Sequence, residues 1–219
     1  MMRRLCLLAS RRLCLLASTP AVARSEWSGT SDDRWDTAVR DLAVRSGRVC
    51  VDERADGQCL FRAVARQLGD GPPKRPLLAA EISECRECVA HALATHADEI
   101  ARRSREHRAA LHALEGDDAR PAVDAAEDAA AAAALRARAA TVRAGDVWGD
   151  DYDLRAIAIS RGGVAHLLRR GDWHVHTFGP TRDSCAPLRS VALGPSDIVV
   201  LFDGHAHFDS MPLAEARGG

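Results

Sequence analysis

The sequence predicts an α+β fold, with helices in the first two thirds of the chain and strands in the last third. Helical spacing of apolar residues dominates until about residue 163, and short apolar runs bounded by turn residues follow. Because helices and strands are largely segregated, we expect a mostly antiparallel or mixed sheet. The 219 residues suit one compact domain with additional terminal sequence, and a hydrophobic fraction of 47% is ordinary for such a domain.

The N-terminal half begins with two predicted helices. Residues 26–48 hold an acid-capped amphipathic pattern that stops at Gly47. Residues 48–53, RVCVDE, are expected to form a short strand. Over residues 59–69 apolar side chains recur every four positions before a glycine, which predicts the second helix. The proline-rich segment 71–76 is a predicted loop.

The middle of the chain is predicted to be mainly helical. A helical pattern runs from about residue 77 to 114, and EGDDARP at 115–121 breaks it. The alanine-rich segment 125–140 is a strong helix former with little apolar bulk, so we expect it on the surface. Within residues 145–163, glycine and aspartate turn residues precede a further helix.

Four short apolar segments near the C-terminus are predicted strands. They are residues 164–168, 173–179, 188–193 and 197–204. Side chains in the second segment alternate with a period of two, as expected for a strand with two different faces. Its histidines, His174 and His176, are expected to be solvated rather than bound to a metal.

Charge and cysteine content limit the classes of function. The formal net charge is -1, which gives no argument for binding nucleic acid or an anionic membrane. Seven cysteines form no disulfide framework and favour a reducing compartment, so we expect a cytoplasmic protein. No apolar run approaches the length that spans a bilayer, so no stable membrane insertion is expected.

The N-terminus carries two identical copies of RRLCLLAS, at residues 3–10 and 11–18. The first 25 residues contain five arginines and no acid, a composition similar to a mitochondrial presequence. AVA at 21–23 also mimics a signal-peptidase site, but a pair of arginines splits the apolar stretch. A targeting segment, mitochondrial or secretory, and a disordered duplicated leader both remain open for residues 1–25.

The segment DGQC places an acid, a glycine and a cysteine immediately before a predicted helix. A thiol at a helix N-terminus feels the positive end of the helix dipole, which predicts a lowered pKa and a nucleophilic thiolate for Cys59. Gly57 permits a tight turn, and backbone N–H groups of such a turn can stabilise an oxyanion. The alternative is a buried cysteine at the start of a core helix, with Asp56 in a turn.

A nucleophilic cysteine needs a base and a group that orients the base. His205 and His207 follow the apolar run IVVLF, so a strand end could carry either imidazole. In an extended chain Asp209 points to the same side as His207 and could fix its ring. Asp56 competes for contacts near the cysteine, and a solvated loop pair is the alternative for His207 and Asp209.

Three motifs occur in order: DGQCLFRA at 56–63, WGDDYDLRAIA at 148–158 and HFDS at 207–210. Together they resemble the ovarian-tumour (OTU) family of cysteine deubiquitinases. The resemblance covers about residues 45–212 and leaves out the leader. It implies a papain-like α+β fold, in which a small central sheet is flanked by helices.

The resemblance also implies roles for individual residues. Cys59 matches the nucleophile of the family and His207 its general base, whereas His205 does not match. Asp56 matches the acid of the first motif, which contributes to the active centre of the family. Asp209 matches the position that orients the histidine in several members. Which acid dominates stays open, although the more specific first motif favours Asp56.

The implied activity is thiol-dependent hydrolysis of the isopeptide bond at the ubiquitin C-terminus through a cysteine thioester. It needs neither a metal nor an organic cofactor. The implied partners are ubiquitin, polyubiquitin chains or a ubiquitin-like modifier, and we expect a monomer. A ubiquitin-binding pseudoenzyme of the same fold is one alternative, and an adaptor that uses the arginine-rich helices at 101–143 is another.

The predicted organisation is therefore a leader at 1–25, a protease domain at 45–212 and a flexible tail at 213–219. Trp148 and Gly149 match a structural turn of the family. Cys85 and Cys88 form a C-x-x-C pair near a histidine, but no second pair follows at finger-like spacing, so we interpret them as helix thiols.

Overall fold

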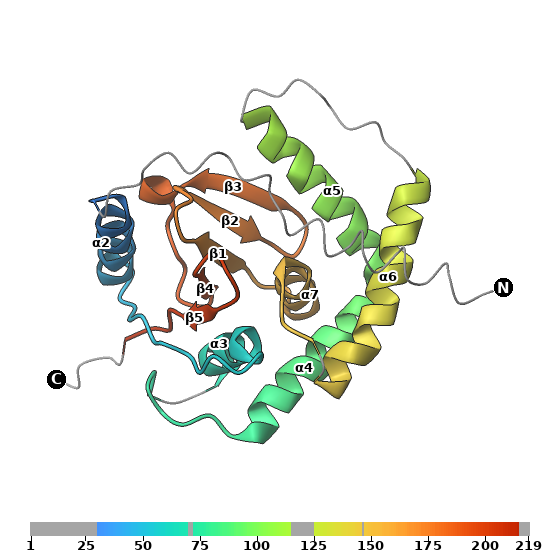
Figure 1. Cartoon of the computed structure of the whole chain (residues 1–219), viewed down its shortest axis with the longest axis horizontal. Helices are drawn as coiled ribbons and strands as arrows, with labels where there is room; N and C mark the ends of the chain where they lie inside the picture. The colour runs from blue at the N-terminus through green and yellow to red at the C-terminus, as the bar shows by residue number, and fades with distance from the viewer. Residues whose placement is uncertain (1–29, 70–71, 115–124, 146, 215–219) are drawn as a thin grey trace.

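The computed structural model describes residues 30–69, 72–114, 125–145 and 147–214. In these ranges the helices precede the strands, as the sequence predicts (Figure 1). The helices are α2 (Thr30–Arg45), α3 (Cys59–Leu68), α4 (Ala79–Thr95), α5 (Ala97–Leu114), α6 (Ala125–Ala144) and α7 (Asp151–Arg161). The leader at 1–25 lies outside the described residues.

The strands form one mixed sheet, which confirms the α+β fold class. They are β1 (Ala165–Arg169), β2 (His174–Phe178), β3 (Asp183–Pro187), β4 (Ile198–Phe202) and β5 (Phe208–Ser210). Their order across the sheet is β3-β2-β1-β4-β5. Only the central β1–β4 pair is parallel, and the pairs outside it are antiparallel.

Helices cover both faces of this sheet (Figure 1). On one face Ala165 and Leu167 of β1 join the larger core, which contains residues of α3 to α7. On the other face Leu168 of the same strand packs in a smaller core with Trp35 and Leu42 of α2. Because successive strand residues point to opposite faces, a sheet buried on both sides needs nearly continuous apolar strands.

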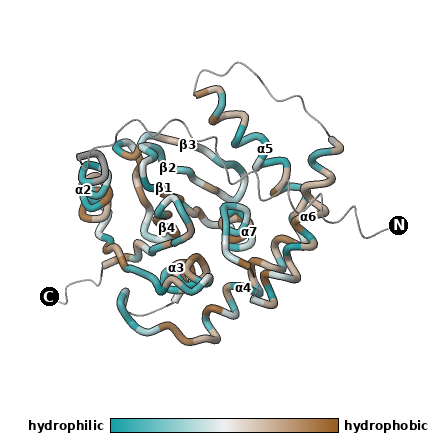
Figure 2. The backbone as a smooth tube through the Cα atoms, viewed as in Figure 1, coloured by the Kyte–Doolittle hydropathy of each residue, from teal (hydrophilic) through white to brown (hydrophobic). Residues whose placement is uncertain are grey.

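The α6 helix lies at the surface, as its composition suggested, with most of its residues exposed or half-buried, but one of its faces is packed. It packs against α4 and α5, and it buries one face made of four residues spaced three or four apart. These residues are Ala132, Leu135, Ala139 and Val142. Alanine has little bulk, so it lets two helix backbones approach closely. Apolar colour recurs along α4 and α6 where they run side by side in Figure 2.

The predicted helix over 77–114 is divided in two at His96. This residue has φ -114° and ψ 20° and ends α4, while Ala97 starts α5. Asp98 and Glu99 then lie in the first turn of α5, where negative charge favours a helix start. A periodic pattern of apolar residues does not register such a change of axis.

Two strand predictions are wrong, and two strands, β3 and β5, lie outside the predicted segments. Residues 48–53 make isolated bridges to residues 213 and 210 and form no strand. Leu188–Ser190 is a 3₁₀ turn that Leu188 anchors by its burial, and residues 188–193 contain no strand. The edge strand β3 precedes it and pairs with β2 through the backbone. Its sequence, DSCAP, lacks the apolar pattern because an edge strand is partly open to water.

The C-terminal end of the described chain contacts the segment that follows α2. Leu213 forms a bridge with Arg48, and the Ala214 N–H donates to the Gly47 carbonyl at 2.8 Å. These contacts hold the first two residues of the predicted tail at 213–219, and the last five lie outside the described residues. No helix in the part of the chain that the structure describes is long and apolar enough to cross a bilayer.

Candidate active site

Cys59 is the first residue of α3 and lies against the segment that carries His207. The DGQC turn reaches it through Gly57, whose φ of +76° favours glycine. The Sγ atom is 3.9 Å from the Ala206 carbonyl oxygen, and the Phe208 N–H is directed at the sulfur. The sulfur therefore contacts the backbone on both sides of His207, although 147 residues separate Cys59 from Ala206.

A tight loop between β4 and β5 sets the position of His207. Asp203 Oδ1 accepts hydrogen bonds from the backbone N–H groups of His205, Ala206 and His207 at 2.8–3.0 Å. Gly204 turns the chain with φ +88°. Burial acts to raise the pKa of Asp203, but these three hydrogen bonds outweigh it and lower the pKa. Sequence reasoning missed Asp203, although an Asp-Gly pair directly after an apolar strand is a turn signal.

The two nitrogens of the His207 ring have different surroundings. Nε2 lies 2.8 Å from Asp209 Oδ1. Nδ1 is buried and has no hydrogen-bond partner among the described residues. Because a carboxylate accepts hydrogen bonds, we assign the ring proton to Nε2, which leaves the Nδ1 lone pair free to accept a proton.

Asp209 is itself held in place from a distant part of the sequence. Its Oδ1 atom also accepts the backbone N–H of Glu53 at 2.9 Å. The structure therefore brings three of the predicted site residues, Cys59, His207 and Asp209, into one cluster between the start of α3 and β5.

Asp56, the fourth predicted residue, contacts the turn rather than the histidine ring. Its Oδ1 accepts the Gln58 N–H at 3.1 Å, and its Oδ2 pairs with Arg62 at 2.7 Å. Burial acts to raise the pKa of Asp56, but the Arg62 and Gln58 hydrogen bonds prevail and lower it. Asp56 therefore stays ionised and fixes the turn in front of Cys59.

The predicted low pKa of Cys59 is wrong for the isolated chain. Cys59 is 2% exposed, and this burial raises the pKa of its thiol. The N–H groups of Phe208, Leu60 and Cys59 itself act in the opposite direction, with a smaller effect. The nearby charge of Asp56 raises the pKa further. A helix N-terminus lowers a thiol pKa, but removing the sulfur from water has the larger effect here.

Trp148 and Gly149 pack against the cysteine turn. A Cβ atom added to Gly149 would overlap the side chain of Leu60, which follows Cys59. A Cβ atom on Gly57 would lie 3.4 Å from Nε1 of Trp148. Trp148 is 54% exposed, so it forms an open wall beside the turn. Both contacts agree with the structural role expected for these two residues.

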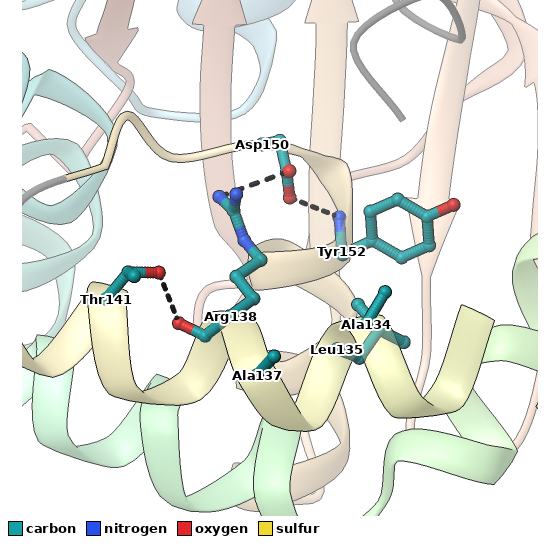
Figure 3. A pocket seen from close by; sticks show the side chains of 7 residues that line it. All are labelled: Ala134, Leu135, Ala137, Arg138, Thr141, Asp150 and Tyr152. Carbon is teal, nitrogen blue, oxygen red and sulfur yellow. Dashed lines mark hydrogen bonds and ion pairs between the residues drawn. The ribbon is translucent and has the colours of Figure 1, made fainter. Parts of the chain in front are cut away.

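A shallow hollow of about 260 Å³ lies beyond this wall, between α6 and the start of α7 (Figure 3). Arg138 reaches across it to Asp150 at 3.1 Å, and Asp150 accepts the Tyr152 N–H at the start of α7. None of the four predicted site residues lines this hollow. Its charged groups are paired with one another and cap the helix.

The two histidines of β2 have different surroundings, and only one of them is solvated as expected. His176 was expected to be solvated, but it is buried between Asp172, 2.9 Å from Nε2, and His107, 3.1 Å from Nδ1. It is buried because α5 covers that face of β2. His174 is exposed, as expected.

Cys85 and Cys88 both lie on α4, as the helical interpretation predicts. Burial raises the pKa of Cys85 to about 12, and Cys88 Sγ lies 3.2 Å from Ser160 Oγ. Among the residues with described positions, no three His, Cys, Asp or Glu side chains are grouped so that they could hold a metal ion.

Comparison with known proteins gives matches among solved structures. No family model and no curated protein sequence matches the chain. An OTU deubiquitinase from Wolbachia pipientis wMel has a TM-score of 0.45 at 12% identity, over 75% of this chain and 88% of that one. The viral OTU domain protease from Farallon virus has a TM-score of 0.49 at 15% identity, over 78% and 87%. That from Taggert virus has a TM-score of 0.43 at 12% identity, over 75% and 78%.

All three structures carry the family name that the sequence motifs suggested. At these identities the likeness concerns the arrangement of helices and strands.

Proposed function

We propose that the chain is a cysteine hydrolase of OTU type that cleaves the isopeptide bond at the ubiquitin C-terminus. One observation carries the proposal: the half-buried His207 ring is bound to Asp209 through Nε2, its buried Nδ1 has no hydrogen-bond partner among the described residues, and the Cys59 sulfur contacts the backbone next to it. A nucleophile, a base and an orienting acid are the three parts that such catalysis requires.

The proposed reaction begins with transfer of the Cys59 thiol proton to Nδ1 of His207. Asp209 stabilises the imidazolium that forms. The sulfur attacks the carbonyl carbon at the ubiquitin C-terminus, and the backbone N–H groups of Cys59 and Leu60, which act on the sulfur, are candidates to stabilise the oxyanion. His207 then gives its proton to the leaving lysine amine, so a thioester remains. Water, activated by the same ring, hydrolyses the thioester and restores the thiol.

Ubiquitin as the substrate rests on the DGQCLFRA and HFDS motifs and on their resemblance to the OTU family. The same chemistry would act on a ubiquitin-like modifier with a similar C-terminus.

A ubiquitin-binding role without catalysis is the second candidate, and the state of Cys59 favours it. The thiol is buried and its pKa is raised, so little thiolate exists in the free protein. The adaptor alternative has less support, because exposed or half-buried arginines of α5 and α6 are paired with acids. Arg102 bonds to Glu106, Arg105 to Asp128 and Arg136 to Asp98.

The deciding experiment treats the protein with ubiquitin carrying an electrophilic C-terminus. We expect covalent labelling of the wild type and of the Cys85→Ala/Cys88→Ala variant, because those thiols are remote helix residues. We expect no labelling of Cys59→Ala and complete loss of di-ubiquitin cleavage, with an unchanged circular dichroism spectrum. Binding of ubiquitin without labelling would favour the pseudoenzyme, and cleavage by folded Cys59→Ala would refute the mechanism.

A further inference from the structure

We propose that Glu53 and Arg66 are positioning residues, which hold the Asp209 carboxylate against the His207 ring. The inference rests on the proposed function, since it assigns a purpose to contacts behind the same site. Neither residue belongs to the motifs that predicted the site, and neither touches the Cys59 sulfur or the His207 ring among the described contacts.

The link to the site is a shared oxygen atom. Asp209 Oδ1 lies 2.8 Å from His207 Nε2 and accepts the Glu53 backbone N–H at 2.9 Å. The Glu53 N–H therefore restrains the same oxygen that orients the ring. Any rotation of the Asp209 carboxylate away from His207 would also break the bond to Glu53.

The Glu53 side chain explains why its backbone is fixed. Glu53 is only 6% exposed, and its carboxylate accepts a hydrogen bond from the Ser210 hydroxyl at 2.7 Å. It also forms two hydrogen bonds with the Arg66 guanidinium, from Nε and, at 3.0 Å, from Nη2. Ser210 follows Asp209 on β5, so Glu53 is bonded to both neighbouring residues of that strand.

Arg66 connects this arrangement to the helix that carries the nucleophile. It lies on α3, seven residues or about two turns after Cys59. Its Nη1 atom donates to the Pro73 and Arg75 carbonyls at 2.8 Å each, so its guanidinium is held at both ends. One helix thus presents the sulfur at its start and anchors the orienting acid near its end.

Attachment of the segment to the sheet does not by itself require this ion pair. Val51 already forms two backbone hydrogen bonds with Ser210, at 2.9 and 3.1 Å. Burying a carboxylate and a guanidinium carries a desolvation cost that an apolar pair would avoid. What the ion pair adds is a fixed direction for the chain at residue 53, where the N–H meets Asp209.

The test is a double-mutant cycle between Arg66 and Asp209. Arg66→Met and Glu53→Gln are each made in the wild type and in Asp209→Ala. Because a small misplacement of a catalytic group is costly, we expect kcat on a fluorogenic ubiquitin substrate to fall about 10-fold, with KM changed less than about 2-fold. In Asp209→Ala the same substitutions should change kcat less than about 2-fold, because the group they position is gone.

Asp183→Asn is the matched control. Asp183 is a buried acid paired with Arg103 and with Arg155, in the latter case at 2.6 Å, and it lies on β3 at the far edge of the sheet. We expect it to lower Tm as Arg66→Met does, without lowering kcat in either background. If Arg66→Met does not fold, the milder Glu53→Gln, which keeps the backbone N–H, gives the same comparison.

A second measurement separates this inference from the proposed function. Site-resolved alkylation of Cys59 by iodoacetamide at neutral pH reports the thiol and ring without ubiquitin. A slower rate in Arg66→Met, present only when Asp209 is intact, supports the positioning role even if the wild type cleaves no ubiquitin substrate. The positioning role would be overturned if the substitutions lowered kcat or the alkylation rate as much in Asp209→Ala as in the wild type. It would also be overturned if they lowered neither quantity in either background. Both outcomes would leave the proposed function in place.

Discussion

His207 and His176 each have an aspartate as the hydrogen-bond partner of Nε2, but the Nδ1 atoms of the two rings have different surroundings. His176 has partners at both nitrogens, Asp172 at Nε2 and His107 at Nδ1. His207 has Asp209 at Nε2, and its buried Nδ1 has no hydrogen-bond partner among the described residues. A buried polar atom without a partner costs stability, so it is retained where a substrate or proton uses it.

The comparison separates the structural histidine from the proposed catalytic one better than sequence context does. Both histidines have an acid within four positions of the sequence, and that acid is a hydrogen-bond partner of the ring. The environment of the second ring nitrogen distinguishes them, and helix packing from elsewhere in the chain decides that environment. In β2 it is α5 that supplies His107, whereas at β5 the start of α3 supplies Cys59.

The largest expected effect contrasts these two histidines. His207→Ala should lower turnover by about 10² to 10⁴, the range for a general acid–base group, with little change in Tm. His176→Ala should do the reverse, because it removes the hydrogen-bond partner of His107 Nε2 and of Asp172 Oδ2. We expect it to lower the free energy of unfolding by about 1–3 kcal/mol and to change turnover only a few-fold.

Turnover of a fluorogenic ubiquitin substrate and urea unfolding of both variants test this contrast. His205→Ala is the matched control, since His205 is exposed in the same loop and should retain near-normal turnover. A larger loss of turnover in His205→Ala than in His207→Ala would show that the final motif is assigned to the wrong histidine.

The next effect concerns the two acids. Asp209 contacts the ring, whereas Asp56 holds the Gln58 N–H and Arg62. The sequence favoured Asp56 as the larger contributor, but these contacts favour Asp209. We expect Asp209→Ala to lower turnover up to about 100-fold, as loss of a partner that orients an imidazole does at metal sites, and Asp56→Ala about 10-fold.

Steady-state kinetics of the two variants compare them directly, and Asp209→Asn serves as the conservative variant because its oxygen still accepts a hydrogen bond. Near-normal turnover of Asp209→Ala together with a severe defect in Asp56→Ala would restore the order that the sequence favoured.

A third test uses the pH dependence of stability to probe His107, the buried partner of His176. Burial lowers the pKa of His107 to about 4, helped by the charges of Arg155 and His176 and opposed by Asp183 and Asp151. An unfolded histidine titrates near 6.5, so unfolding takes up a proton between pH 6.5 and 4. Stability should therefore be complete above pH 6.5 and fall by at most about 3 kcal/mol as the pH approaches 4.

Urea unfolding at pH 7 and pH 5 measures this loss. His107→Gln, which keeps a hydrogen-bonding group near His176, should show a smaller loss between the two pH values. An equal loss in the wild type and in His107→Gln would assign the pH dependence to other groups.

The smallest expected effect is at the C-x-x-C pair. Cys85→Ala/Cys88→Ala should change turnover no more than a few-fold, because both thiols lie on α4 and not in the cluster around Cys59. A small loss of stability is expected from Cys85, which is buried. Loss of turnover on the order of that in His207→Ala would mean that these thiols support the site.

The sequence alone was sufficient for the local features of this protein. A helix starting at Cys59, a turn requiring Gly57, and a histidine and an aspartate two residues apart in an extended segment all depend on neighbours along the chain. Propensity and periodicity report such short-range preferences directly. The α+β class followed from the same local signals, since helical and strand patterns occupy different parts of the chain.

Tertiary packing decided the features that depend on distant residues. Burial of the Cys59 sulfur raised a pKa that the helix dipole alone would lower. The contact between Glu53 and Asp209 joins residues 156 positions apart, and α5 enclosed a histidine that alternation placed on an open face. The edge strand β3 has no apolar signature because backbone pairing with β2 forms it. Periodicity along the chain predicts which way a side chain points, but only the packed neighbours determine its solvent access, its charge and its hydrogen bonds.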